Sequence, residues 1–240
     1  MKTKREIDLT NSLETVYTIL KHLTQKEKEQ IAGHSSCIFL PKGQMVFREG
    51  ETPNHLECLI SGQVKVFKEG IAGRDWIARM VNSAQLLGYR ALFGEENYNV
   101  SAQTIQDSII CRIDKDTIFS ILKKNSNLMF EIMKILAREL GFVHAKTITL
   151  TQKHIRGRLA EALLFLEQTY GMEDDSQTLK VKLSREDLAN LSNMTTANAI
   201  RTLSAFSLEK LVELDGRKIK LLDRHSLEHI SQIEAKHIYN

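Results

Sequence analysis

A stretch of short hydrogen-bonding side chains around one arginine carries the most distinctive chemistry in this sequence. No acidic residue occurs between Ser192 and Leu208, so such a surface would not repel a phosphate backbone. The guanidinium of Arg201 has two donors spaced to bond a guanine edge, and hydroxyl or amide groups can reach bases or phosphates. The polar positions assigned to the outer face are Thr195, Thr196, Asn198, Arg201, Thr202 and Ser204. With Ala197 and Ile200, which lie among them, they form a predicted DNA-contacting surface.

Two short amphipathic helices must position these residues. Ser184 is a good N-cap, and Asp187 follows three residues later, as a capping box prefers. Asn193 stands at the break between the helices, where asparagine tolerates a left-handed backbone, and Thr195 caps the second helix. The residues expected to face inward are Leu188, Ala189, Leu191, Ala199 and Leu203. The pattern predicts a helix-turn-helix whose second helix enters the major groove.

A β hairpin is predicted directly after the two helices. Residues 210–223 read as two alternating strands around Asp215-Gly216, and the basic residues Arg217, Lys218 and Lys220 could hold the nucleic-acid backbone. From residue 153 onward the chain carries 13 basic and 13 acidic residues, so its positive charge must be localised. The acidic run of residues 173–175 is therefore expected to lie away from DNA. A winged helix used for protein contacts remains an alternative.

Composition bounds the class of protein. The chain has 240 residues, 42% hydrophobic and 26% charged, with a net charge of +3. The longest apolar run, residues 162–166, is too short to span a bilayer, and the first residues lack a secretory signal, so a cytoplasmic protein without a membrane partner is expected. No HExxH pattern occurs. The cysteines Cys37, Cys58 and Cys111 form no CxxC, and free, mostly buried thiols are expected.

The residue pattern changes along the chain and indicates a succession of different elements. Residues 11–32 read as helical, and residues 37–115 as many short strands separated by glycines, which is typical of a small barrel or sandwich. Residues 126–151 then carry apolar side chains at heptad spacing, which suits a two-stranded coiled coil between two chains. The two seam positions hold Met129, Leu136, Val143 and Leu150, and Met133, Leu140 and Thr147. A core helix packed on its own barrel is the alternative. Residues 178–184 alternate as a strand.

This order of elements resembles the CRP/FNR family of bacterial transcription regulators, named after the cyclic-AMP receptor protein and the fumarate-nitrate regulator. The resemblance covers nearly the whole chain and rests on residues 39–68, 156–166 and 183–223. It implies an α+β fold with an N-terminal double-stranded β-helix (a cyclic-nucleotide-binding-like jelly roll), a long dimerisation helix and a C-terminal winged helix-turn-helix. It also implies a guanine-reading role for Arg201, while Thr196 and Ala197 replace two other family positions and predict a different target sequence.

The ligand-binding residues depart from the family pattern. In the cyclic-nucleotide binders a glycine-acid pair and an Arg-Ser-Ala cradle hold ribose and phosphate. Here Tyr89 follows Gly88, while Asn99 and Val100 stand before Ser101 where Arg and Ser are expected. Arg90 is one residue out of place, and Val143 and His144 replace the polar pair that would meet the base. We take these eight positions as the candidate effector pocket, and binding of cyclic AMP in the usual mode is not expected.

The sequence therefore predicts a homodimeric DNA-binding regulator. Its expected partners are a palindromic double-stranded operator, RNA polymerase and an unidentified small-molecule effector. The expected domains are residues 1–125 for effector sensing, 126–152 for dimerisation and 153–240 for DNA binding. The alternatives are a haem- or redox-sensing member of the same family, with His144 as the most interesting haem candidate, a cupin-like barrel enzyme with a dimer module, and a scaffold. No catalytic or metal-binding residues are assigned.

Overall fold

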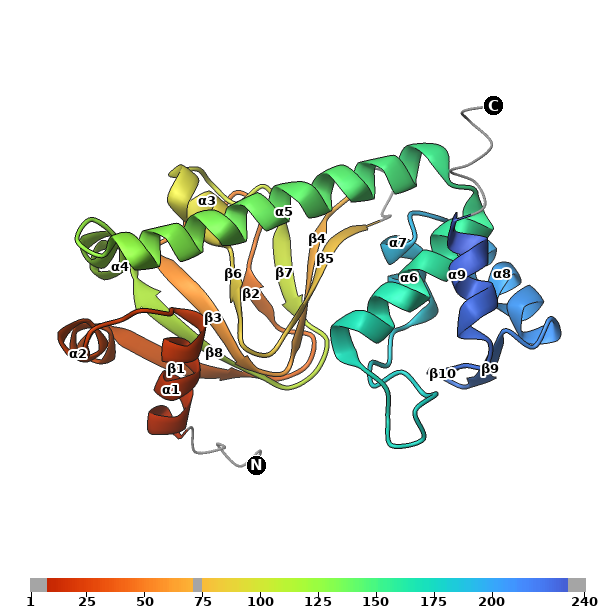
Figure 1. Cartoon of the computed structure of the whole chain (residues 1–240), viewed down its shortest axis with the longest axis horizontal. Helices are drawn as coiled ribbons and strands as arrows, with labels where there is room; N and C mark the ends of the chain where they lie inside the picture. Colours follow the sequence, from red (N-terminus) through yellow and green to blue (C-terminus); the bar gives the residue numbers. More distant parts are fainter. Residues whose placement is uncertain (1–7, 71–74, 233–240) are drawn as a thin grey trace. The chain divides into compact units, whose positions relative to one another are not determined.

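The computed structural model describes residues 8–70 and 75–232. They fall into two compact units, the first within residues 1–69 and 79–140 and the second within residues 70–78 and 141–240. Figure 1 shows the chain from its N-terminal helices (red) to its C-terminal helices (blue). The predicted fold class is confirmed, because a β-rich N-terminal domain is followed by a long helix and a C-terminal helix-turn-helix.

Two antiparallel sheets of four strands form the barrel of the first unit. One sheet has the strand order β1-β8-β3-β6 and the other β2-β7-β4-β5. The strand bounds are β1 Ser35–Leu40, β2 Met45–Phe47, β3 His55–Ser61, β4 Gln63–Lys68, β5 Trp76–Asn82, β6 Gln85–Leu87, β7 Ser101–Thr104 and β8 Ser108–Asp114. Side chains from strands of both sheets meet in one buried cluster, which includes Phe47, Leu59, Val64, Ala102 and Ile110. This cluster is the barrel interior.

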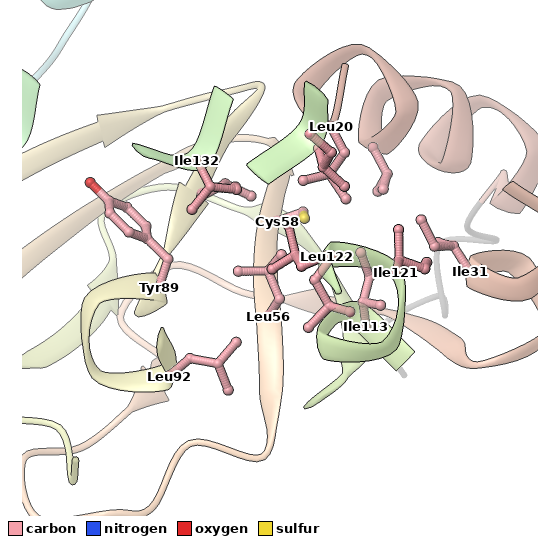
Figure 2. Packing of buried hydrophobic residues seen from close by; sticks show 14 of the residues in the cluster. Leu20, Ile31, Leu56, Cys58, Tyr89, Leu92, Ile113, Ile121, Leu122 and Ile132 are labelled. Carbon is pink, nitrogen blue, oxygen red and sulfur yellow. The ribbon is translucent and has the colours of Figure 1, made fainter. Parts of the chain in front are cut away.

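Helices cover the outer face of the first sheet. They are α1 (Leu9–Ile19), α2 (Gln25–Gly33), α3 (Tyr89–Gly94), α4 (Lys115–Leu122) and the first half of α5 (Ser126–Gln152). Their buried side chains form a second cluster with strand residues on that face, and Figure 2 shows Leu20, Ile113 and Ile132 within it. We call it the helix-sheet core. The first half of α5 therefore packs on its own barrel, as the alternative interpretation of the heptad seam proposed.

The second unit is mostly helical. It contains the second half of α5, then α6 (Ile155–Tyr170), α7 (Arg185–Leu191), α8 (Thr196–Leu208), the hairpin β9 (Val212–Asp215) and β10 (Lys218–Leu221), and α9 (Arg224–Gln232). The hairpin pairs Asp215 with Lys218 around Gly216, whose φ is 55°. Gly216 thus supplies the positive φ that a tight hairpin requires. Among the described residues, no helix is both long and apolar enough to cross a membrane.

Three sequence-based expectations are wrong. Residues 11–32 are not one helical stretch, because Thr24 and Glu27 form a capping box that begins a new helix. Residues 178–184 form only isolated bridges, although Thr178, Leu179, Val181 and Leu183 are buried. The cysteines are not all free, because Cys37 and Cys111 are joined in a disulfide and only Cys58 is a free thiol. Spacing along the chain gave no sign of this bond, since 74 residues separate its partners.

Candidate functional site

The two helices of the helix-turn-helix are capped as the sequence indicates. The Ser184 hydroxyl accepts a 2.9 Å hydrogen bond from the Asp187 amide, and the Thr195 hydroxyl accepts one of 3.2 Å from the Asn198 amide. Asn193 has a φ of 49°, which makes the sharp turn between the helices. The five residues predicted to face inward, Leu188, Ala189, Leu191, Ala199 and Leu203, are all buried. Local chemistry thus sets the orientation of α8.

The outer face of α8 carries most of the predicted DNA-contacting residues. The exposed ones are Thr195, Thr196, Ala197, Ile200, Arg201 and Ser204, and Asn198 is half-buried. The Arg201 guanidinium donates a 2.6 Å hydrogen bond to the Asn198 side-chain oxygen. This bond holds the two polar side chains next to each other on α8. Thr202 does not belong to this face, because it is buried with only 9% of its surface exposed. The error arises because Thr202 lies one residue, or about 100°, beyond Arg201 around the helix.

An arginine that sequence reasoning missed ties the hairpin to the helix-turn-helix. Arg185, the first residue of α7, donates a 2.8 Å hydrogen bond to the carbonyl oxygen of Gly216 at the hairpin turn. Partial burial lowers the pKa of this guanidinium. Arg217, at the same turn, is exposed. The hairpin tip is therefore held beside the start of α7, with Arg217 directed to solvent.

The acidic loop lies against the hairpin cations. The Glu173 carboxylate is 3.9 Å from the Lys218 ammonium, and Lys220 is 3.3 Å from Glu213. Asp175 accepts hydrogen bonds from the Thr178 hydroxyl and amide, which lower its pKa to about 2 and fix the loop in place. Residues 173–175 are predicted to lie away from DNA, and Glu173 nevertheless lies beside Lys218, one of the cations that we expect to hold the DNA backbone. Sequence distance concealed this neighbour, because Thr178 bridges to Lys220 only in the folded chain.

A half-buried lysine connects α5 to the helix-turn-helix. Lys146 donates a 3.0 Å hydrogen bond to the carbonyl oxygen of Leu191, the last residue of α7. Burial lowers the pKa of Lys146, and the nearby Glu161 carboxylate opposes that shift. A carbonyl at a helix C-terminus carries partial negative charge and has no partner within its own helix. Lys146 therefore couples the second half of α5 to the turn that precedes α8.

Aromatic rings fill the barrel beside Gly88. The rings of Phe47 and Tyr98 are stacked with centroids 3.9 Å apart and planes 11° from parallel. Gly88 has a φ of 66°, and a Cβ atom placed there would lie 2.7 Å from the Tyr98 ring. The glycine thus allows the close approach of a side chain of this protein.

Tyr89 joins the barrel's short helix α3 to α5. Its hydroxyl accepts a 2.7 Å hydrogen bond from Arg79 and donates one of 2.9 Å to Glu139. Arg79 and Glu139 are themselves 3.1 Å apart. Burial raises the pKa of Tyr89 to about 12, so the phenol stays protonated and can donate to Glu139. Figure 2 shows its ring in the helix-sheet core with the hydroxyl directed away from that cluster. We call these three residues the Tyr89 network.

The other candidate pocket residues do not converge. Arg90 is exposed and pairs with Glu96 at 2.8 Å, and Asn99 is exposed. Val100 packs beside the barrel interior, whereas the buried Ser101 hydroxyl accepts a 3.0 Å hydrogen bond from the Glu49 amide. Val143 and His144 are exposed residues of α5 within the second unit. The structure therefore assembles Gly88, Tyr89 and their aromatic neighbours, and it does not form a cationic cradle from residues 99–101.

An ion pair that sequence reasoning missed joins the buried carboxylate of Glu57 to the half-buried guanidinium of Arg112 in the barrel. The Arg112 Nε atom is 3.1 Å from both carboxylate oxygens of Glu57, and the guanidinium also reaches the Val46 carbonyl at 3.4 Å. Burial raises the pKa of Glu57 to about 7, and the opposing effect of Arg112 is smaller. Both residues alternate along their strands with buried apolar residues, which is the one pattern that could have revealed them.

Each of the two units contains a match to a known family model. The family model of the cyclic nucleotide-binding domain matches residues 37–125, and that of the Crp-like helix-turn-helix domain matches residues 157–230. The fold and the site together define a DNA-binding transcription regulator. The curated relatives described below are named as regulators. The chain belongs to the CRP/FNR family.

Individual relatives agree with this assignment. The CRP-like cAMP-activated global transcriptional regulator of Mycobacterium tuberculosis is 26% identical over 189 residues, covering 78% of this chain and 84% of that protein. The anaerobic regulatory protein of Bacillus subtilis is 26% identical over 202 residues, covering 83% and 80%. The solved structure of FixK2 from Bradyrhizobium japonicum has a TM-score of 0.73 at 18% identity, covering 82% of this chain and 96% of that one, and supports the fold alone.

Proposed function

We propose that this protein binds a palindromic double-stranded DNA operator as a homodimer, with α8 in the major groove and Arg201 reading a guanine. The exposed, acid-free face of α8 is the observation that carries the proposal. The contact residues are Thr195, Thr196, Ala197, Asn198, Ile200, Arg201 and Ser204, with Arg217 and Lys218 on the hairpin. RNA polymerase is the proposed protein partner, and the cytoplasm the proposed compartment.

A stripe of exposed apolar residues on α5 supports dimerisation. Met129, Met133 and Leu140 recur at heptad spacing with between 38% and 56% of their surface exposed. A contiguous apolar stripe of this kind is typical of an interface in a soluble protein. Leu136 contributes less than the sequence indicates, because it packs in part against the helix-sheet core. His144 follows Leu140 by four residues, so it falls on the same face of α5.

The proposed effector is not a cyclic nucleotide bound in the family's usual mode. Phe47 and Tyr98 occupy the space beside Gly88, and no residue of 99–101 supplies a cation for the phosphate. This differs from the Mycobacterium tuberculosis relative, whose name describes activation by cAMP. For haem, the other group considered, His144 is exposed and no contact of a described residue favours it.

Two polar contacts of α5 suggest how an effector acts. Glu139 bonds Tyr89 at the barrel, and Lys146, seven residues later, bonds the end of α7. We therefore propose that α5 transmits a change at the barrel to the recognition helix. Such a coupling requires that the effector favour one of two arrangements of α5.

Selection of operators from a random duplex pool tests the proposal. The purified chain should enrich a palindromic sequence and bind it as a dimer, with the two half-sites about one helical turn apart. Sedimentation would give the stoichiometry, and fluorescence anisotropy the affinity for the enriched and a scrambled duplex. Equal affinity for both duplexes would contradict sequence-specific regulation.

A further inference from the structure

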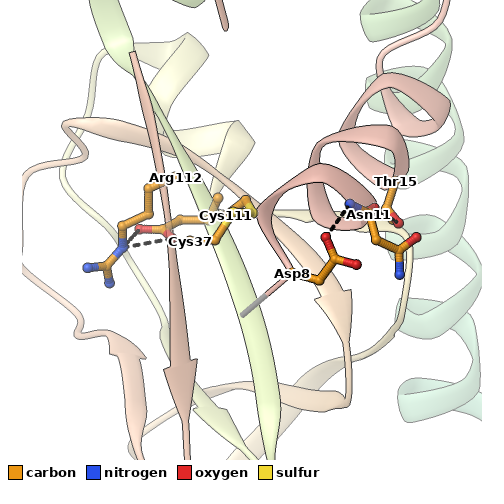
Figure 3. Close-up of a disulfide and its surroundings, with 7 residues drawn as sticks. Asp8, Asn11, Thr15, Cys37, Cys111 and Arg112 are labelled. Atoms are coloured by element: carbon orange, nitrogen blue, oxygen red, sulfur yellow. Dashed lines mark hydrogen bonds and ion pairs between the residues drawn. A yellow bond between two sulfur atoms is a disulfide. The ribbon is translucent and has the colours of Figure 1, made fainter. Parts of the chain in front are cut away.

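Three cysteines lie in one row across three adjacent strands. Cys37 on β1 and Cys58 on β3 both pair directly with Cys111 on β8, which lies between them. Side chains of directly paired residues point to the same face of a sheet. Cys37 and Cys111 are joined in a disulfide with Cα atoms 4.0 Å apart, while Cys58 is a buried free thiol. Figure 3 shows the disulfide beside the first turns of α1, near Asp8 and Asn11.

The proposed location of this DNA-binding regulator in the cytoplasm bears on the role of the disulfide. Where a cell keeps its thiols reduced, a protein disulfide is usually transient and redox-sensing rather than a permanent cross-link. Cys37 is half-buried and accessible, whereas Cys111 is fully buried behind it. Burial raises the pKa of the Cys58 thiol, which disfavours the reactive thiolate at that position. The accessible member of the row is therefore also a member of the disulfide.

We propose that Cys37 and Cys111 form a reversible thiol–disulfide couple, oxidised by a peroxide, that sets the affinity for the operator. The Cys37 thiolate attacks one peroxide oxygen, which gives a sulfenic acid and one water after proton uptake. The Cys111 sulfur then displaces the second water, and the sulfur–sulfur bond forms. The two thiols lose two electrons and the peroxide gains them. A cellular dithiol reverses the reaction by becoming a disulfide itself. This inference rests on the proposed function.

The packing around the row connects the couple to α5. Cys111 and Cys58 belong to the helix-sheet core, together with Leu128 and Ile132 of α5 and Leu20 of α1. Two sulfurs that are not bonded must move from covalent to van der Waals separation, a change of more than an ångström. A close-packed core cannot absorb that change without moving its neighbours. Reduction should therefore shift the first half of α5, whose second half holds α7 through Lys146.

Operator binding in two redox states tests the couple. The full chain is treated either with hydrogen peroxide or with dithiothreitol, free thiols are alkylated, and intact mass reports the disulfide. Fluorescence anisotropy then gives the dissociation constant for an operator selected as above. We expect the two states of the wild-type chain to differ by about 5-fold or more. Cys37→Ser and Cys111→Ala should each remove the difference, and the matched control Cys58→Ala should retain it.

Each other result overturns a defined part of the argument. If peroxide forms no Cys37–Cys111 disulfide, or if both states of the wild-type chain bind the operator equally, the regulatory couple is wrong. Persistence of the difference in Cys37→Ser would also overturn it. If the disulfide forms and reverses but neither state prefers any duplex, the proposed function fails, and the regulatory role with it. Circular dichroism of each variant confirms that it is folded.

Discussion

The recognition helix and the barrel interior are built on opposite principles. The exposed face of α8 consists of residues within ten positions of one another, and its caps, turn and inward side chains follow from local spacing. The barrel interior joins Phe47 to Tyr98 and Glu57 to Arg112, pairs that are 51 and 55 residues apart. Spacing along the local sequence determines which residues share one face of a helix. Strand pairing and register determine which residues meet in the packed interior between two sheets.

The same difference separates the expected effects of mutation. Changes on α8 should alter binding and leave stability nearly untouched, because the side chains are exposed. Changes in the barrel should alter stability first, because the side chains are buried and close-packed. Helix α5 has its first half in the first unit and its second half in the second, so changes on its exposed face should alter DNA binding without lowering stability.

The largest effect is expected from the exposed stripe of α5. Met133→Glu combined with Leu140→Glu should give monomers by sedimentation and weaken operator binding roughly 100-fold or more, because a monomer engages one half-site and loses the gain of bivalent binding. Both side chains are about half exposed, so the fold should persist. Arg138→Glu, an exposed change on the same helix but off the stripe, is the matched control. A double variant that remains dimeric would place the interface elsewhere.

Gly88→Ala should destabilise the first unit by about 2–4 kcal/mol, the sum of a left-handed backbone cost and overpacking. The added methyl group would lie 2.7 Å from the Tyr98 ring. Gly43→Ala is the control, because Gly43 also has a positive φ of 85° but nothing lies within 4 Å of its Cβ position. Urea unfolding of both variants isolates the ring contact. Equal losses would mean that the rings yield, and that the space beside Gly88 can open to a ligand.

Glu57→Gln should remove a pH dependence of stability. The pKa of Glu57 is raised to about 7 in the folded chain from an ordinary value of 4.5, so the folded state prefers the protonated acid. The stability contributed by this group is complete below pH 4.5 and is lost as the pH rises through 7, by about 1–3 kcal/mol. Urea midpoints between pH 5 and 8 should therefore fall more steeply for the wild-type chain than for the variant. Parallel curves would contradict the raised pKa.

These contrasts explain how much of the molecule the sequence predicts. The order of elements, the helix-turn-helix, the hairpin and the inward face of α8 follow from caps, periodicity and turn residues. The disulfide, the Glu57–Arg112 pair and the Tyr89 network do not, because each depends on which strands or helices become neighbours. Thr202 shows the limit of such prediction within one helix. A shift of one position along α8 decides whether a side chain faces the DNA groove or the protein core.

Arg201→Ala should weaken operator binding about 5- to 150-fold at fixed salt, because a bidentate guanine contact is worth roughly 1–3 kcal/mol. It should also flatten the preference at one base pair of each half-site. The variant's urea midpoint should not move, since the side chain is exposed. Arg217→Ala is the comparison. It removes an exposed cation at the hairpin tip, so this variant should lose affinity equally for all duplexes. Should Arg201→Ala lose affinity uniformly, Arg201 binds phosphate and Thr196 or Asn198 must read the bases.

The smallest effect is expected where the acidic loop meets the hairpin. Lys218 and Glu173 are both partly exposed and 3.9 Å apart, so their pairing contributes less than about 1 kcal/mol to stability. In the DNA complex the same carboxylate competes with phosphate for the ammonium and repels the backbone. Glu173→Gln should therefore strengthen binding to every duplex by about 2- to 5-fold and steepen the salt dependence by about one unit.

A variant of the neighbouring acidic residue distinguishes the effect of the Glu173–Lys218 contact from the effect of the loop's net charge. Asp174→Asn removes the same charge from the same loop, and Asp174 is exposed. Binding isotherms across a salt series should show a gain for Glu173→Gln that Asp174→Asn does not match. Equal gains would mean that the loop acts only through its overall charge. No gain in either variant would mean that Lys218 does not reach phosphate, and the hairpin would then contact DNA through Arg217 alone among the two cations proposed there.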